Sequence, residues 1–343
     1  GRAGEGLQVQ TSLLHRMGSG SDPGLRLDQV ITKPARGCRG RAFLPAVIAR
    51  MSDATIIILL SMITTGLMLG MIFSLVAVGV TIIYGSIWMP NAANGQFFLL
   101  AALLLWSASV SWGLHPALAA LIIIGLSVPF SYALEILLIR RFYDVPNRNI
   151  SYFVLSLGIT QILAGIFSIT YGIWSDQFQL PPLVGGLTML GPFPMVNNRL
   201  AAMLIAALLL VALFTLLRYH RYGRALRAVF QNREAAALRG VDVRAVYRMS
   251  FMLGNAVVFA GGVLFACAYS FDFSIAWTMA ITAFAIMIIG GPGSVLGALV
   301  IGMVFGLTQA AVSIFASPTI AAFSYLGAML VILLFRPSGL FAR

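Results

Sequence analysis

Charged side chains are scarce in this sequence. Only 9% of its 343 residues are Asp, Glu, Lys or Arg, whereas 60% are hydrophobic, and the mean hydropathy is +0.95. A soluble domain carries roughly 25% charged residues, which it needs to cover a water-facing surface. The composition therefore excludes an ordinary soluble globular protein.

The residues that support metal binding and catalysis are also few. The sequence has two cysteines, Cys38 and Cys267, and three histidines that lie far apart. No Cys/His spacing typical of a metal site occurs, and neither a Ser/His/Asp set nor a pair of carboxylates stands out. The phosphate-binding pattern G-x-x-x-x-G-K-[ST] is absent as well. We therefore expect a non-catalytic protein with no metal and no cofactor.

The net charge of +12 does not predict binding to nucleic acid. Lys33 is the only lysine, and the arginines cluster between or beside apolar segments. Membrane topology produces this placement of basic residues. We therefore expect the protein to lie in a lipid bilayer and to bind no nucleic acid.

Long apolar runs are abundant. Many of them reach the roughly 20 residues that a helix needs to cross the hydrocarbon core, and they are too continuous for the alternating strands of a porin. We expect an all-α fold, a polytopic transmembrane helical bundle of about eight or nine spans, some broken or re-entrant. The expected spans are residues 54–85, 96–113, 116–139, 150–172, 200–218, 249–270, 277–291, 294–316 and 318–335.

The first apolar run is interrupted by polar residues. Asn91, Asn94, Gly95 and Gln96 follow it directly. Non-helical backbone at membrane depth is tolerated where it is buried in protein or lines a water-filled cavity. We place Asn91, Asn94 and Gln96 nearest a solute path, and the alternative is that they only satisfy the backbone groups freed by the break.

Glycines mark two further features of the expected bundle. The short 277–291 run ends in a turn for which we expect a hinge or a close helix contact, formed by Gly290, Gly291, Gly293 and Ser294. The pairs Gly66/Gly70 and Gly302/Gly306 have the small-xxx-small spacing of closely crossing membrane helices. We expect these four glycines to serve packing.

Residues 1–50 differ from everything that follows. They are rich in Arg, Gly, Ser and Pro and contain neither an apolar period nor the apolar core of a signal peptide. We interpret them as a basic disordered tail, or as a segment upstream of a true start at Met51 that is not part of the protein. Residues 51–343 are expected to form the transmembrane domain.

The placement of arginine indicates an orientation. Arginines cluster at 140–148, at 218–248 and after the last span, and all three sets fall on one side of the expected spans. The positive-inside rule makes this side cytoplasmic, together with the C-terminus, and places residues 173–199 outside. The expected location is the bacterial inner membrane, with multiple crossings.

The polar loop 218–248 predicts a short capped helix. Asn232 is placed to cap its first turn, Glu234 lies near its positive end, and Gly240 is placed to end it in a left-handed conformation. One interpretation is a basic loop that only fixes topology. The other is a rigid cytoplasmic helix that docks into another protein.

This loop resembles the coupling region of ABC-importer permeases, in which E-A-A is followed after three residues by Gly. Glu234, Ala235, Ala236 and Gly240 match that spacing, and Arg224 and Ala225 with the residues around them resemble the branched-chain amino acid permease family. Three further elements resemble that family in the same order. They are Tyr84-Gly85 with Met89 to Gln96, Thr282 to Ala298 with its G-G-x-G-S pattern, and Arg336 to Phe341, which reads R-P-x-G-L-F.

The resemblance covers residues 56 to 341 and implies a permease subunit of an ABC importer for branched-chain or related amino acids. It implies three kinds of protein partner besides the lipid bilayer: a second homologous permease subunit, two ABC ATPase subunits and a periplasmic substrate-binding protein. ATP hydrolysis would then occur in the partner chains. The sequence leaves homo- or heterodimeric pairing of the permease open.

The sequence departs from the family at positions of the expected solute path. The family's His-Gly-Glu is Asn94, Gly95 and Gln96 here, and a Glu expected near position 309 is Gln309. These changes remove ionisable groups but keep amides, which lowers the cost of burial in the bilayer. Urea, short amides or another amino acid therefore stay open as substrates. A stand-alone secondary transporter and a membrane scaffold without transport are the alternatives from other classes.

Overall fold

The computed structural model describes residues 43–143, 147–172, 177–182, 186–190, 193–315, 320, 327, 329–332, 334–336 and 339–341. The chain divides into two units, Gly1–Ala54 and Thr55–Arg343. Residues 1–42 of the predicted tail lie outside the described residues. The first described helix begins at Phe43, so it includes the last residues of the segment interpreted as tail. The description below concerns the second unit.

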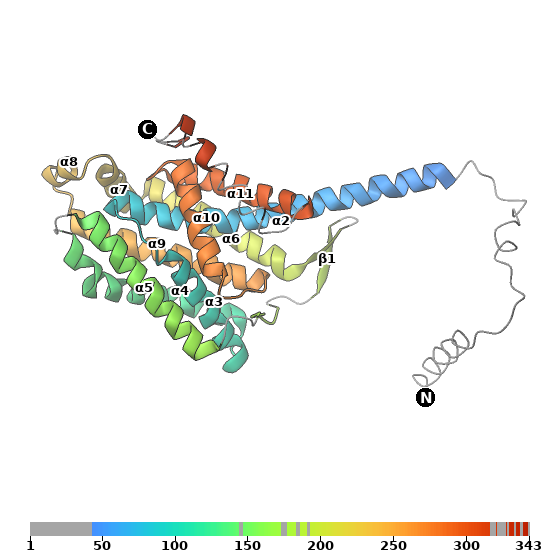
Figure 1. Cartoon of the computed structure of the whole chain (residues 1–343), viewed down its shortest axis with the longest axis horizontal. Coiled ribbons are helices and arrows are strands. Elements are labelled where there is room, and N and C mark those ends of the chain that lie inside the picture. Colours follow the sequence, from blue (N-terminus) through green and yellow to red (C-terminus); the bar gives the residue numbers. More distant parts are fainter. Residues whose placement is uncertain are drawn as a thin grey trace, which may run out of the picture. The chain divides into compact units, whose positions relative to one another are not determined.

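Helices make up nearly all of the described residues (Figure 1). They are α2 (Phe43–Ile87), α3 (Asn94–Trp106), the π-helical turn η2 (Ser107–Ser111), α4 (Pro116–Leu137), the 3₁₀ turn η3 (Ile139–Phe142), α5 (Arg148–Tyr171), α6 (Asn197–Tyr219), α7 (Arg221–Gln231), α8 (Arg233–Leu238), α9 (Val243–Ala268), α10 (Ile275–Gly290) and α11 (Val295–Phe315). Among the described residues, 7 helices are long and apolar enough to cross a membrane, and α10 is a shorter apolar helix. The predicted all-α polytopic bundle is confirmed. Most of the expected last span, 318–335, lies outside the described residues.

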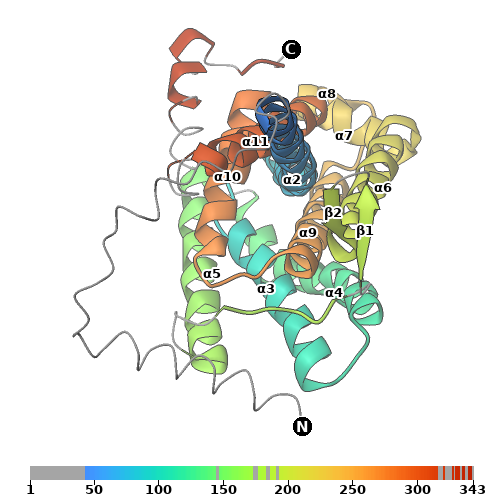
Figure 2. The same ribbon diagram turned by 90° about the vertical axis from the view of Figure 1, so that its right-hand side faces the viewer.

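The spans divide into an inner and an outer set. Most residues in the spans of α2, α3 and α9 are buried within the protein, whereas fewer than a third are buried in those of α4, α5 and α6. In Figure 2, α3 and α9 lie inside the bundle, with α5 and α6 on opposite sides of it. Because these exposed faces are apolar, they suit contact with lipid or with another membrane subunit.

The expected close helix crossings are present between α2 and α11. A Cβ added at Gly66 would lie 2.9 Å from Leu307 Cα, and one added at Gly306 would overlap the backbone of Gly70. Ser74 on α2 lies in the same crossing and donates a hydrogen bond to the Leu299 carbonyl oxygen (2.8 Å). The small residues let the two backbones approach, as their spacing predicts.

Three local features differ from the sequence expectation. Strands β1 (Leu187–Leu190) and β2 (Phe193–Val196) form an antiparallel hairpin within the segment expected to be a loop. Helix α7 precedes the expected short helix. Helix α9 begins several residues before its expected apolar start, because Asp242 Oδ1 accepts a hydrogen bond from Ala245 N (3.1 Å) and caps a polar first turn.

Candidate functional site

The chain is interrupted between α2 and α3. Helix α2 ends at Ile87, and Trp88 takes the left-handed conformation (φ 57°) before α3 begins. Asn91 Oδ1 accepts a hydrogen bond from Ala93 N (3.1 Å), and Asn91 Nδ2 donates one to Asn94 Oδ1 (3.0 Å). Both asparagines are buried. Asn91 thus satisfies one backbone N–H freed by the break, and the place of both asparagines in a solute path stays a prediction.

The interruption is held between α5 and α10. Ala92 N donates a hydrogen bond to Ser156 Oγ on α5 (3.0 Å). Gly95 faces α10 so closely that an added Cβ would lie 2.8 Å from Ala280 Cβ and would overlap the Ala276 carbonyl oxygen. Gly95 therefore serves close packing of α3 on α10, and no side chain fits at this position.

A cleft of about 460 Å³ lies beside the interruption, between α3, α5 and α10. Its polar lining comes from Gln96 on α3 and from Gln161 and Ser168 on α5, and its apolar lining includes Leu99 and Trp277. Gln96 is buried, and its Oε1 has no hydrogen-bond partner among the described residues. None of the residues that line the cleft is charged. A buried acceptor without a partner carries a free-energy cost.

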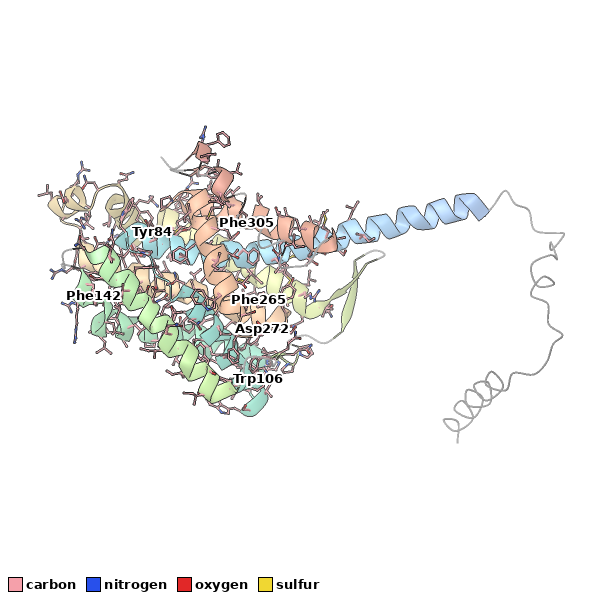
Figure 3. All side chains as sticks on the ribbon, viewed as in Figure 1. Tyr84, Trp106, Phe142, Phe265, Asp272 and Phe305 are labelled. Atoms are coloured by element: carbon pink, nitrogen blue, oxygen red, sulfur yellow. The ribbon has the colours of Figure 1, made fainter. Side chains whose placement is uncertain are left out.

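A cluster of aromatic rings lies beside this cleft. Phe178 stacks on Phe271 with 5.6 Å between ring centroids, and it also lies 5.1 Å from Trp106 and 5.6 Å from Phe273. The backbones of Phe178 and Phe271 exchange two hydrogen bonds (2.8 and 3.1 Å). Phe273 also lines the cleft. The aromatic cluster thus adjoins the cleft through Phe273. Trp106, which belongs to the cluster, lies near Asp272 at one end of the bundle (Figure 3).

The expected path residues are only partly brought together. Gln96 lines the cleft, whereas Asn91 and Asn94 are not part of its lining. Gln309 lies half-buried on α11 and is not part of it either. Three polar or amphipathic residues line the cleft although the sequence did not predict them as path residues: Gln161, Ser168 and Trp277. Gln161 and Ser168 are spaced by two helical turns, and this shared face was the available sequence signal.

The short helix expected in the loop 218–248 is present as α8. Asn232 Oδ1 accepts hydrogen bonds from Glu234 N and Ala235 N (both 3.0 Å), so it caps the helix as predicted. Gly240 follows with φ 82°, the left-handed conformation expected of it. Ala236 is buried, while Glu234 and Ala235 are exposed.

Leu238 at the end of α8 is the most exposed large hydrophobic side chain among the described residues, with 91% of its surface accessible. Its neighbours in the chain, Ala237 and Arg239, are exposed too, as is Arg233 at the start of α8. In Figure 1, α8 and α7 lie at one end of the bundle and β1 lies at the other. The capped helix thus presents one apolar side chain among charged ones at the bundle's end.

Helix α7 connects α8 rigidly to the bundle. Arg227 on α7 donates hydrogen bonds to the carbonyl oxygens of Leu217 and Arg218 at the end of α6. Tyr222 OH and Ser250 Oγ on α9 form a hydrogen bond of 2.9 Å. Burial raises the pKa of Tyr222 to about 12, although the bond to Ser250 opposes this shift, so the hydroxyl stays protonated at neutral pH. Arg224 is exposed and Ala225 half-buried on the same helix.

Phe230 on α7 reaches a point where three segments meet. A Cβ added to Gly85 at the end of α2 would lie 2.8 Å from Phe230 Cζ and 2.8 Å from Gly293 Cα. One added to Gly339 near the C-terminus would lie 2.6 Å from Gly291 Cα. We call Gly85, Phe230, Gly291, Gly293 and Gly339 the glycine junction. It brings together segments that are far apart in the sequence and that each carry one of the motifs described above.

The turn between α10 and α11 forms the centre of the glycine junction. Gly291 and Gly293 have φ angles of 93° and 83°, which disfavour any other residue. Gly290 packs on Gly297, whose N–H donates a hydrogen bond to Ser294 Oγ (3.1 Å). The close helix contact expected for these residues is therefore present, and a hinge function stays a prediction.

Comparison with known proteins identifies the same family that the sequence motifs resemble. The sequence model of a family described as "Branched-chain amino acid transport system / permease component" matches residues 62–334. The high-affinity branched-chain amino acid transport system permease protein LivH of Salmonella typhimurium is 27% identical over 295 residues, which cover 81% of this chain and 94% of that protein. BraD of Pseudomonas aeruginosa, named as a permease protein of the same kind of system, is 26% identical over 303 residues (83% and 96%). No solved structure gives a significant match.

Proposed function

Since the chain belongs to the branched-chain amino acid transport system permease family, we propose that it forms the translocation path of an ABC importer together with a second, homologous permease subunit. The family match over 62–334 is the observation that carries this proposal. The chain is a multi-pass membrane protein. The inner membrane as its location and a cytoplasmic C-terminus are parts of the proposal, supported by the arginine clusters in and around α7 and α8.

Two ATPase subunits and a periplasmic binding protein complete the proposed complex. The sequence contains no phosphate-binding loop, so ATP hydrolysis is assigned to the partner chains. Helix α8 supports docking of an ATPase subunit, because its backbone ends are capped and Leu238 is exposed among charged residues. Such a helix keeps its conformation when it is pushed.

The glycine junction supports a mechanical route from α8 to the cleft. Phe230 contacts the end of α2, which leads into the interruption at Asn91 and Asn94. It also contacts Gly293 in the turn that ends α10, the helix whose first turn contributes Trp277 to the cleft. A displacement of α7 would therefore reach both sides of the solute path through the close contacts of Phe230 with Gly85 and Gly293, because close-packed segments transmit a shift.

Branched-chain or related amino acids are the proposed substrates. The named relatives LivH and BraD support this class. Urea or short amides form the alternative, favoured by the neutral amides of Gln96 and Gln161 in the cleft. A stand-alone secondary transporter would need intramembrane ionisable groups for ion coupling, and none lines the cleft.

Reconstitution of the complete complex in proteoliposomes tests the proposal. Candidate binding proteins loaded with leucine, valine, urea or acetamide are added, and uptake and ATP hydrolysis are measured together. We expect ATP-dependent uptake of branched-chain amino acids with stimulated hydrolysis. Uptake by this chain alone, driven by an ion gradient and without ATPase subunits, would overturn the proposal.

A further inference from the structure

The groove between α5 and α10 changes character along its length. The cleft described above lies on one side of Trp277 and contains Gln96, Gln161 and Ser168. On the other side lies a groove of about 260 Å³, which Trp277 also lines. The remaining lining of that groove is entirely apolar and includes Leu157 and Phe284. Polar groups are therefore confined to one half, although both halves run between the same two helices.

Lipid alone does not account for the polar half. Gln161 is exposed in the middle of α5, and only a small share of this span is buried within the protein. A polar side chain that faces hydrocarbon without a partner costs free energy. The apolar half shows that the same groove can be built without any such group. The amides in the cleft thus indicate an occupant that forms hydrogen bonds.

We propose that this cleft is a solute-binding station of the translocation path that takes a small aliphatic amino acid. The amide N–H of Gln96 and the hydroxyl of Ser168 donate hydrogen bonds to the carboxylate of the solute, and the Gln161 carbonyl oxygen accepts one from its ammonium group. Leu99 and Trp277 contact the aliphatic side chain. The inference rests on the proposed function and adds to it the position of the solute and the groups that hold it.

The absence of charge in the lining fits a station that releases its solute. A fixed ionic partner for the ammonium or the carboxylate would form strong, charge-assisted hydrogen bonds. Neutral amides form weaker ones, and a path conducts only where binding is weak enough for the solute to leave. The volume of about 460 Å³ lies within the usual range for small-molecule sites, roughly 300–1,000 Å³.

Thiol protection tests the station directly in the reconstituted complex. Cys38 and Cys267 are replaced by serine and alanine, and a reporter cysteine is introduced as Ala164→Cys, in the lining of the cleft. Its reaction with a small, water-soluble methanethiosulfonate reagent is followed with leucine at increasing concentration and without binding protein. We expect leucine to slow the reaction. The matched control is Leu157→Cys, seven residues earlier on the same face of α5 but in the apolar groove, where leucine should protect nothing.

Two further variants connect protection to named groups. Gln96→Met keeps the length of the side chain but removes the amide, and we expect the leucine concentration for half-protection to rise about tenfold, as for one lost hydrogen bond. Trp277→Ala should weaken protection by leucine more than protection by glycine, because glycine has no aliphatic side chain. Equal protection of both reporters, or unchanged half-protection in Gln96→Met, would overturn the proposed station. If the complex with native Gln96 and Trp277 fails to import any amino acid, the proposed function fails instead.

Discussion

Phe230 lies against Gly85 so closely that a single added methyl group on Gly85 would come within 2.8 Å of the ring. The two residues belong to elements with different tasks: α7 continues into the exposed helix α8, and α2 leads into the interruption beside the cleft. Glycine allows this approach because it has no side chain. The contact joins the surface proposed for ATPase docking to the proposed solute path without any intervening loop.

Phe230→Ala should uncouple the two sites. The ring fills the space between Gly85 and Gly293, and its loss leaves a cavity that absorbs a displacement of α7. We expect assembly with the ATPase subunits to persist, basal ATP hydrolysis to continue, and solute-stimulated uptake per ATP to fall at least about fivefold, the effect of roughly 1 kcal/mol of lost coupling. Phe230→Leu, which fills part of the space, should retain an intermediate ratio. A normal uptake-to-hydrolysis ratio in Phe230→Ala would contradict the mechanical route.

Gly95→Ala should destabilise the protein. An added Cβ would overlap the Ala276 carbonyl oxygen, which belongs to the backbone of α10 and has little room to move. We expect a cost of about 1–3 kcal/mol, as for overpacking in a core, seen as a lower thermal midpoint in detergent. The matched control is Gly125→Ala on α4, where an added Cβ meets nothing within 4 Å. That change should raise stability slightly, since alanine favours a helix by about 1 kcal/mol over glycine. Equal midpoints for both variants would argue against the close packing of α3 on α10.

Much of the bundle follows from the sequence alone. Apolar runs of membrane-spanning length give the spans, and the spacing of Gly66, Gly70, Gly302 and Gly306 gives one helix crossing. The cap of α8 by Asn232 is equally local, because its hydrogen bonds run to residues two and three positions away. These features depend on side-chain periodicity or on neighbouring residues, so they are visible without tertiary structure.

The cleft and the glycine junction are not local in this sense. Gln161 and Ser168 occur within an ordinary apolar run. They line a shared cavity only because α5, α3 and α10 leave a cleft between them. Likewise, the sequence shows Gly85, Gly293 and Gly339 as parts of separate motifs, and their meeting depends on how three segments fold back. The two asparagines of the interruption show the reverse: they stand out in the sequence, but in the fold they bind each other and lie outside the cleft lining.

Asn232→Ala should loosen α8 and weaken coupling. Asn232 Oδ1 accepts hydrogen bonds from two backbone N–H groups that otherwise have no partner in the helix. Loss of such a cap costs about 1 kcal/mol. Because α8 has only 6 residues, we expect a large part of its helical population to be lost. Hydrogen exchange of the Glu234 and Ala235 amides measures this, and solute-stimulated ATP hydrolysis should fall in parallel. Asn232→Ser, which restores a capping oxygen, should rescue both; failure of the rescue would separate the cap from coupling.

Leu238→Ser should weaken ATPase docking without destabilising the chain. The side chain is 91% exposed and makes little contact within the protein, so its removal costs little folding free energy. If Leu238 enters an apolar pocket of the ATPase subunit, its loss removes a buried anchor, and the dissociation constant for that subunit should rise about tenfold. The measurement is binding of purified ATPase subunit to the permease in nanodiscs, with the thermal midpoint as a stability control. Leu238→Met keeps an apolar side chain of similar size and should bind nearly as the original. Unchanged affinity of Leu238→Ser for the ATPase subunit would contradict an apolar anchor at this position. Docking would then depend on the charged residues of α8, and Glu234→Arg should bind the ATPase subunit more weakly.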